Sequence, residues 1–358
     1  MTPPISSSTA SSPSSKATSR GGRALPALVA AALLLFAAEA GSRLALRLAD
    51  PDRFDHDAAW RAAWERRHDG TVAVYYGFDA YDPLRGWILK PNLEGVTVFG
   101  DKKLSSGSHG ARGPERAYAK PAGVKRVVVL GDSFTFGDEA GDEEVWPRRL
   151  EALLPGVEVI NLGVHGWGHD QMLLHLREEG LKYSPDLVLL GFAEVDMPRN
   201  LLSFRDYAKP RFLLEKGRLV RLGVPVPPPE ESARAAAYRA RLPDVLSLLA
   251  FGLERRLAPG RRAARAEALT AALLDELSRT AASGGARFAL LRLPDRSTPS
   301  ASPFFSDYCR ARGLTCLDLA SLGPSLRYQP GGHWDGAGHA AVAAAAKELV
   351  HESLFPRR

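Results

Sequence analysis

Cysteine and methionine are scarce in this chain, whose 358 residues include two cysteines and three methionines. Cys309 and Cys316 stand too far apart to form a Cys-x-x-Cys pair, which excludes that redox motif and the zinc sites built on it. We expect the two thiols either to form a disulfide in an oxidising compartment or to lie buried as small hydrophobic residues.

Motifs of several common enzyme classes are absent as well. The sequence contains no Gly-x-Ser-x-Gly elbow, no P-loop, no Gly-x-Gly-x-x-Gly fingerprint and no His-Glu-x-x-His pair. His165, His169 and His175 fall close together, but no cysteine and no pair of carboxylates joins them at metal-ligand spacing. We therefore expect no metal and no cofactor, and we expect these histidines to be solvent-facing or loop residues.

Positive charge is in excess but is not concentrated. The chain carries 47 Lys and Arg against 41 Asp and Glu, a net charge of +6. A nucleic-acid-binding surface typically has a compact basic tract interleaved with aromatic residues. This chain has no such tract, because its arginines are scattered among alanines. The composition argues against nucleic acid as a partner and assigns the excess charge to a solvated surface and to the flanks of a membrane segment.

The N-terminal region predicts membrane targeting. Residues 1–22 are mostly Ser, Thr, Pro, Ala and Gly and are expected to be a disordered tail. Residues 23–48 open with an arginine, after which Ala24 to Ala38 are uncharged and rich in Leu and Ala. They predict an inner-membrane anchor that leaves the rest of the chain outside the cytoplasm. The alternative is a signal peptide cleaved near Ala38-Glu39-Ala40, which would release a secreted or periplasmic protein.

The remainder of the chain predicts an α/β domain. Residues 49–123 lack clear periodicity and are expected to be an irregular lead-in, whereas residues 124–355 alternate apolar runs with amphipathic stretches. This alternation predicts a parallel sheet covered by helices on both faces, with the carboxyl ends of its strands at one edge. Strands are expected at 126–130, 158–161, 187–192, 288–293 and 314–317, and helices at 145–154, 171–180, 266–283 and 337–351.

An insert at about residues 197–264 interrupts this rhythm. Its Pro-rich run from Val224 to Pro229 predicts an extended linker, and residues 230–257 predict a helical segment. Because the insert follows a predicted strand, it is expected to be either a lid over the site or a surface excursion.

A serine follows the first predicted strand of the domain. The run Gly131-Asp132-Ser133-Phe134-Thr135-Phe136-Gly137 comes directly after the largely apolar residues 124–130. Parallel α/β sheets expose their chemistry on loops at the carboxyl ends of strands, so Ser133 is a candidate nucleophile. Asp132 is expected to hold the loop through hydrogen bonds to the backbone.

Two further blocks complete a pattern. A glycine-rich loop follows the second predicted strand, Asn161-Leu162-Gly163-Val164-His165-Gly166-Trp167-Gly168, and its backbone N–H groups can approach a substrate oxygen. Near the C-terminus, Gly332-His333-Trp334-Asp335 precedes the last predicted helix and supplies a candidate base. From about residue 81 onward, these blocks resemble the SGNH (GDSL-type) hydrolase superfamily, especially its membrane-anchored bacterial members.

The resemblance implies a flavodoxin-like three-layer α/β/α sandwich acting on acyl esters through an acyl-enzyme. It makes Ser133 the nucleophile and His333 the general base, with the backbone N–H groups of Ser133 and Gly163 in the oxyanion hole. The implied substrate is an acyl-ester small molecule, a lipid or an O-acetylated envelope glycan.

Two positions depart from the family pattern. Val195 stands where the family carries an Asn that donates to the oxyanion, and valine cannot donate. No carboxylate occurs at residues 328–332, where the family places an Asp that orients the histidine. Asp335, on the other side of His333, is a candidate orienting carboxylate and equally a candidate cap for the last helix.

These departures keep two other functions open. One is a catalytically silent domain that binds a glycan or another partner through Trp167 and Trp334. The other is a polysaccharide O-acyltransferase, in which an alcohol replaces water as the acyl acceptor. The presence of both Ser133 and His333 favours an active esterase, since a silent site has little physical reason to keep a nucleophile and its base.

Overall fold

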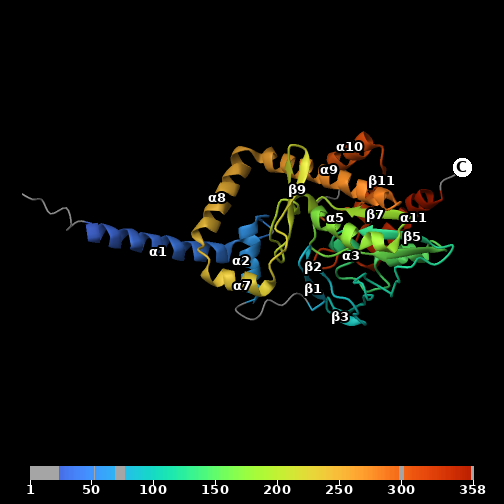
Figure 1. Cartoon of the computed structure of the whole chain (residues 1–358), viewed down its shortest axis with the longest axis horizontal. Helices are drawn as coiled ribbons and strands as arrows, with labels where there is room; N and C mark the ends of the chain where they lie inside the picture. Colours follow the sequence, from blue (N-terminus) through green and yellow to red (C-terminus); the bar gives the residue numbers. More distant parts are fainter. Residues whose placement is uncertain (1–23, 52, 69–76, 298–301, 356–358) are drawn as a thin grey trace, which may run out of the picture.

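The computed structural model describes residues 24–51, 53–68, 77–297 and 302–355, so the predicted N-terminal tail lies outside the described residues. At its centre is a five-stranded sheet in the order β6-β5-β7-β10-β11, with every neighbouring pair parallel (Figure 1). The strands are β5 (Lys125–Leu130), β6 (Val157–Asn161), β7 (Leu187–Phe192), β10 (Arg287–Arg292) and β11 (Thr315–Asp318).

This strand order identifies the fold. Numbered along the chain, the sheet reads 2-1-3-4-5, which is the flavodoxin-like order, and its ligand site falls at the carboxyl end of the first strand. The prediction of a flavodoxin-like three-layer α/β/α sandwich is confirmed. All five predicted strands overlap those observed.

Two helical layers cover the sheet, and alternate residues of each strand contact one layer or the other. Val128 and Leu130 of β5 pack into one core cluster, whereas Val127 and Val129 pack into the other. Each such buried side chain contributes about 1.5–3 kcal/mol. The first layer contains α5 (His169–Glu178), α9 (Pro259–Ser283) and α10 (Pro303–Arg312), and the second contains α4 (Trp146–Ala152) and α11 (Gly336–Leu354).

The lead-in supports the first turn of the site. It forms two antiparallel hairpins, β1 (Asp79–Asp82) with β2 (Gly86–Leu89) and β3 (Val96–Val98) with β4 (Lys102–Leu104). Phe78, Leu89 and Leu104 form a small core with Phe136, which belongs to the turn α3 (Ser133–Phe136). The lead-in therefore packs directly against the segment that carries Ser133.

The insert is built differently from the prediction. After α6 (Asp196–Arg199) it forms a hairpin of β8 (Arg211–Glu215) and β9 (Arg218–Leu222), and its helical part is broken into α7 (Pro229–Tyr238) and α8 (Leu242–Leu257). α9 already begins at Pro259, because a proline fits the first turn of a helix. α8 packs against the N-terminal helices α1 (Ala24–Leu48) and α2 (Asp57–His68) rather than over the site.

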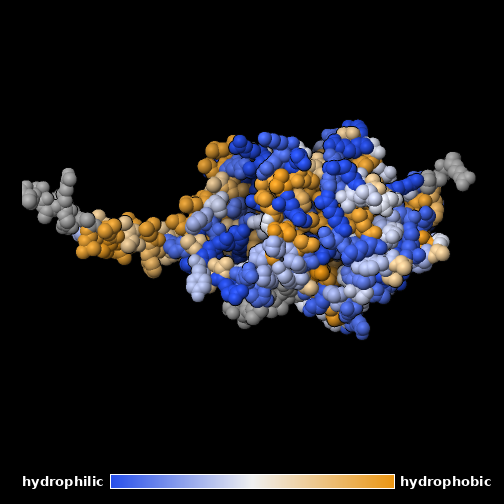
Figure 2. Space-filling view, viewed as in Figure 1, coloured by the Kyte–Doolittle hydropathy of each residue, from blue (hydrophilic) through white to orange (hydrophobic). Residues whose placement is uncertain are grey.

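α1 extends away from the body of the protein (Figure 1). Leu25–Leu48 is long and apolar enough to cross a membrane, and its exposed leucines form the apolar projection in Figure 2. The end of α1 does contact the domain, since Leu46 packs with Ala58 and Ala62 of α2.

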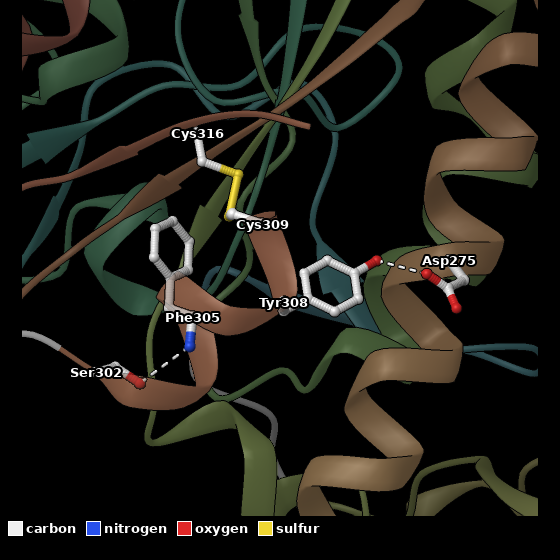
Figure 3. The surroundings of a disulfide bond; sticks show 6 residues. All are labelled: Asp275, Ser302, Phe305, Tyr308, Cys309 and Cys316. Carbon is white, nitrogen blue, oxygen red and sulfur yellow. Dashed lines mark hydrogen bonds between the residues drawn. A yellow bond between two sulfur atoms is a disulfide. The ribbon is translucent and has the colours of Figure 1, made fainter. Parts of the chain in front are cut away.

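The two cysteines form a disulfide that joins α10 to the edge strand β11 (Figure 3). At the other end of α10, Ser302 Oγ accepts a hydrogen bond of 3.3 Å from the N–H of Phe305. Tyr308 donates to Asp275 of α9 over 2.8 Å. Of the two alternatives that the sequence left open for these thiols, the structure has the disulfide.

Removal of this disulfide is expected to lower the free energy of unfolding. The bond closes a loop between residues seven apart, and freeing such a short loop in the unfolded chain costs about 2 kcal/mol. Urea unfolding of the Cys309→Ser/Cys316→Ser variant measures the change. Equal stability with and without the bond would contradict the prediction.

Candidate active site

Ser133 sits where β5 meets α3, at the carboxyl edge of the sheet. Asp132 is the N-cap of this turn, and its carboxylate accepts a hydrogen bond of 3.0 Å from the N–H of Phe134. Gly137 ends the turn in the left-handed conformation, with φ of 96°, which glycine adopts without a steric penalty. One turn between a capping aspartate and a glycine thus presents the serine, and Asp132 holds the loop in the predicted manner.

His333 lies beside the serine. Its Nε2 is 2.9 Å from Ser133 Oγ, a hydrogen-bond distance between residues 200 positions apart in the chain. The histidine precedes α11, and Trp334 next to it packs against Phe134 with ring centroids 4.8 Å apart. The structure therefore brings together the two residues that the sequence singled out as nucleophile and base.

The carboxylate that contacts His333 is Glu139. Its Oε2 lies 3.3 Å from His333 Nδ1 and accepts a hydrogen bond of 3.1 Å from the N–H of His333. A carboxylate at Nδ1 favours the tautomer with its proton there, which leaves Nε2 free to accept the serine proton. Ser133, His333 and Glu139 thus have the geometry of a nucleophile, base and orienting acid.

Glu139 occupies the space beside Gly331. A Cβ atom on Gly331 would lie 2.7 Å from Glu139 Oε2, and the N–H of Gly331 donates to Glu139 Oε1 over 2.9 Å. Glu139 reaches this place from the loop after α3 with φ of 63°, an uncommon conformation for a residue with a side chain. Sequence analysis missed Glu139; the signal was a glycine at position 331 together with an acidic residue just after the nucleophile turn.

Asp335 does not contact the histidine in this structure. It is the N-cap of α11, and its carboxylate accepts a hydrogen bond of 2.9 Å from the N–H of Gly338. Of the two roles considered for Asp335, the structure places it in the capping role. The carboxylate within hydrogen-bond distance of His333 Nδ1 is that of Glu139.

The glycine loop differs from the prediction as well. The N–H of Gly163 donates to Asn161 Oδ1 over 3.0 Å, and Gly163 does not line the cavity in front of Ser133. A Cβ at Gly163 would lie 2.6 Å from the backbone nitrogen of Phe136, so this glycine permits close packing on α3. Gly166 does line the cavity, and neither its N–H nor that of Ser133 has a hydrogen-bond partner among the described residues. Gly166, rather than Gly163, is therefore the glycine of this loop that borders the cavity in front of Ser133.

The cavity has a volume of about 790 Å³. Val195 lines it, so the position that would hold an oxyanion-binding asparagine presents a methyl surface. Arg199, one turn further along α6, lines it too, and its Nη1 donates to Asp132 Oδ2 over 3.0 Å. Although burial opposes the cation, the carboxylates of Asp196 and Asp132 raise the pKa of Arg199. A permanent positive charge therefore faces the cavity close to the missing donor.

Asp138 adds a second, partly buried carboxylate beside His333. It lines the cavity, its Oδ1 has no hydrogen-bond partner among the described groups, and its Oδ2 is 3.8 Å from His333 Nε2. Burial raises the pKa of this carboxyl, a shift that the nearby His165, His333 and Arg112 partly offset. Asp138 can favour the charged imidazolium of His333 that forms when Ser133 gives up its proton.

His165, His169 and His175 are all buried. His165 lies on the glycine loop, as predicted, whereas His169 and His175 belong to α5, contrary to the prediction that they face solvent or lie on loops. His169 and His175 pack inside α5, where burial lowers the pKa of His169 to about 3 and holds that of His175 well below its ordinary value. Within the part of the chain that the structure describes, no group of three His, Cys, Asp or Glu could hold a metal. Trp167 and Trp334 are fully buried too, so they serve loop packing rather than the sugar-stacking platform considered for them.

His165 lines the cavity as one half of a buried ion pair. Its Nε2 lies 2.8 Å from Asp79 Oδ2. Burial disfavours the imidazolium, but the charge of Asp79 outweighs it and raises the pKa of His165 to about 9. Because this value exceeds the ordinary 6.5, the pair stabilises the fold fully below that pH, and its contribution is lost as the pH rises through about 9.

We therefore expect Asp79→Asn to lower the pKa of His165 from about 9, because burial remains while the closest negative charge is gone and only those of Asp138 and Asp206 still raise it. An NMR titration of the imidazole measures the change. Tyr207→Phe is the matched control, since it removes a hydrogen bond of 3.1 Å to Asp79 and leaves the charge in place. A His165 pKa that stays near 9 in Asp79→Asn would contradict this account of the pair.

Several solved structures are similar to this chain at low sequence identity. The chain is similar to a protein from Desulfitobacterium hafniense DCB-2 assigned to the lipolytic G-D-S-L family, at 16% identity over 63% of this chain and 99% of the other, with a TM-score of 0.39. A GDSL-like lipase from Bacteroides thetaiotaomicron VPI-5482 matches at 14% identity over 67% and 93%, with a TM-score of 0.39. A two-domain esterase active on acetylated mannans matches at 13% identity over 65% and 50%, with a TM-score of 0.36.

No protein-family model matches the chain, and no curated protein matches it. Several of the matching structures carry lipase, esterase, acylhydrolase or lipolytic descriptions. The solved proteins that this chain resembles are GDSL-type lipolytic proteins and acylhydrolases, the same superfamily that its sequence motifs resemble.

Proposed function

We propose that this protein is a serine esterase that cleaves acyl esters through a covalent acyl-enzyme. The observation that carries the proposal is the contact of 2.9 Å between Ser133 Oγ and His333 Nε2, with the Glu139 carboxylate on the far side of the imidazole. A nucleophile, a base within hydrogen-bond reach and a group that orients the base are the three parts that such a reaction needs.

The reaction follows from these positions. Ser133 Oγ attacks the acyl carbon while His333 Nε2 takes the serine proton, and Glu139 holds the resulting imidazolium. The bond to the alcohol then breaks, and His333 returns the proton to the leaving oxygen. Water attacks the acyl-serine with His333 again as base, which releases the carboxylic acid and restores the serine.

Charge on the carbonyl oxygen is stabilised by the backbone N–H groups of Ser133 and Gly166 in this proposal. Val195 cannot donate a hydrogen bond, so the donor that an asparagine would supply at this position is missing. The loss of a single donor typically slows such a reaction by about 100- to 1000-fold. The cation of Arg199 faces the same cavity and can compensate part of that loss.

Hydrolysis is favoured over the other two functions. The buried Trp167 and Trp334 cannot serve as the exposed glycan platform of a silent binding domain. The insert contributes Arg199, Arg205 and Asp206 to the cavity wall. No residue of its hairpin or of α7 and α8 lines the cavity, so these elements do not exclude water from the acyl-enzyme, as transfer to an alcohol would require.

We further propose that α1 tethers the enzyme to a membrane and is retained. The carboxylate of Glu39 accepts hydrogen bonds from the N–H groups of Arg241, at 2.8 Å, and Leu242, at 3.0 Å. Arg66 donates to the carbonyl oxygen of Leu46, also in α1, over 2.8 Å. Cleavage after Ala40 would remove Glu39 and expose the start of α8, so these contacts support an anchor over a cleaved signal.

The experiment that tests the esterase is covalent labelling by a fluorophosphonate, detected by intact mass. The wild-type chain should take up one label on Ser133, and Ser133→Ala should take up none. Labelling requires an activated serine and no knowledge of the natural ester. A folded wild-type chain that never labels would reject the esterase in favour of the silent domain.

A further inference from the structure

Helix α8 carries an apolar face that no part of the described chain covers. Leu246, Leu249, Leu253 and Leu257 are 55%, 64%, 56% and 73% exposed. Their spacing of three and four residues places them along one side of the helix. The opposite side packs inward, with Phe251 buried and Val245 and Leu248 against the cluster of Leu46, Ala58 and Ala62.

This face continues the apolar surface of α1. The carboxylate of Glu39, on α1, binds the first N–H groups of α8, so the two helices meet at a fixed point. In Figure 1 α8 runs across the direction of α1, along the side of the body from which α1 emerges, and Figure 2 shows apolar residues along that edge. A membrane crossed by α1 would therefore lie along α8.

The length of the uncharged part of α1 also indicates how close the body of the protein lies to the membrane. At 1.5 Å per residue, the uncharged residues 24–38 cover about 22 Å, whereas the hydrocarbon core of a bilayer is about 30 Å thick. Because Glu39, directly after this stretch, is bound to the start of α8, the body of the protein lies close to the bilayer when residues 24–38 are inside it. The apolar face of α8 is the surface in position to do so.

Arginines gather at the same place. A cavity of about 590 Å³ at the base of α1 is lined by Arg43, Arg47, Arg66 and Arg241, with Glu65 as its one acid. Arg241 pairs with Glu65 over 2.9 Å and Arg43 with Glu39 over 3.1 Å. Arg47 has no ion pair among the residues that the structure describes. The net positive charge suits the phosphate of an anionic phospholipid.

We propose that α8 is an interfacial helix that inserts its leucine face into the membrane, with the arginine cavity beside it holding an anionic phospholipid headgroup. The inference rests on the proposed anchoring by α1 and is independent of the esterase chemistry. An amphipathic helix bearing leucines on one face and flanked by arginines binds membrane surfaces in this way.

The test places a fluorophore at single cysteines in the full chain, reconstituted into vesicles that contain brominated lipid and phosphatidylglycerol. Both native cysteines are held in the disulfide, so an introduced cysteine labels selectively. Leu249→Cys reports on α8, Leu33→Cys on α1, and Lys347→Cys, exposed on α11, on the body. The proposal expects lipid quenching of the labels at 33 and 249 and none at 347.

Three results would overturn it. Quenching at 33 but not at 249 would leave the anchor standing and reject the interfacial helix. No quenching at either position would reject the anchor itself. Shielding of the label at 249 that depends on protein concentration in detergent, without lipid quenching, would assign the face to a second copy of the chain.

The headgroup site has its own measurement, the preference for spin-labelled phosphatidylglycerol over spin-labelled phosphatidylcholine. Each arginine near an anionic surface contributes about 1 kcal/mol, so Arg43→Gln/Arg47→Gln should lower the preference by about fivefold per arginine. An unchanged preference would reject the headgroup site. Ester turnover should be unaffected, because neither arginine lines the catalytic cavity.

Discussion

Replacement of Ser133 with alanine is expected to lower kcat for p-nitrophenyl acetate by about 10⁶-fold, the loss typical of a triad serine whose removal disables the whole unit. His333→Ala should cause a loss of the same order, and the double variant little more, because the two side chains act together. Release of p-nitrophenol, corrected for spontaneous hydrolysis, measures the rates. The expectation follows from the hydrogen bond between Ser133 Oγ and His333 Nε2.

Ser297→Ala is the matched control. Ser297 lines the same cavity, but its hydroxyl donates to Asp295 over 2.5 Å and has no histidine beside it. This variant should keep most of the wild-type rate. Wild-type turnover in a folded Ser133→Ala protein would show that another group is the nucleophile. Wild-type turnover in His333→Ala would rule out His333 as the general base.

Glu139→Gln should lower kcat by about 10⁴-fold, which is the cost of replacing the orienting carboxylate of a triad by its amide. Glutamine keeps the size of the side chain but can present an N–H to His333 Nδ1, which favours the tautomer that cannot accept the serine proton. The same ester assay measures the loss. Thermal unfolding of the variant shows whether the loop still folds.

Asp335→Asn is the control for this second prediction, because asparagine also caps helices. It should retain both activity and stability, whereas Asp335→Ala should lose about 1 kcal/mol of stability with no loss of rate. The opposite result, with Asp335→Asn inactive and Glu139→Gln active, would return the orienting role to Asp335. A second check is Gly331→Asp combined with Glu139→Gly, which should recover activity that Glu139→Gly alone lacks.

Much of the fold could be predicted from local patterns. The runs around Val128, Leu189 and Leu290 are apolar enough to be buried strands, and the amphipathic stretches between them imply crossover helices. The glycines and the short motifs around Ser133 and His333 marked the loops that carry chemistry. The break between α7 and α8 was missed although Pro243, in the first turn of α8, marks a helix start.

The rest depended on contacts between distant parts of the chain. Glu139 and His333 are 194 positions apart, and no periodicity or spacing relates them. Gly163 and Gly166 lie in one loop, and only the packing of α3 against the first of them separates their roles. The contact of Glu39 with the start of α8 joins residues more than 200 positions apart. The packing of α8 against α1 therefore could not be predicted from local sequence.

The pair formed by Gly331 and Glu139 has an evolutionary consequence. An aspartate at 331 would collide with the glutamate that is present, and a glycine at 139 would leave His333 Nδ1 without a carboxylate partner. Neither change is tolerable alone, so a lineage can move between the two arrangements only through a weakened intermediate or a paired substitution. Proteins of this lineage should therefore be recognised by covariation, with an acid at one of these two positions and a small residue at the other.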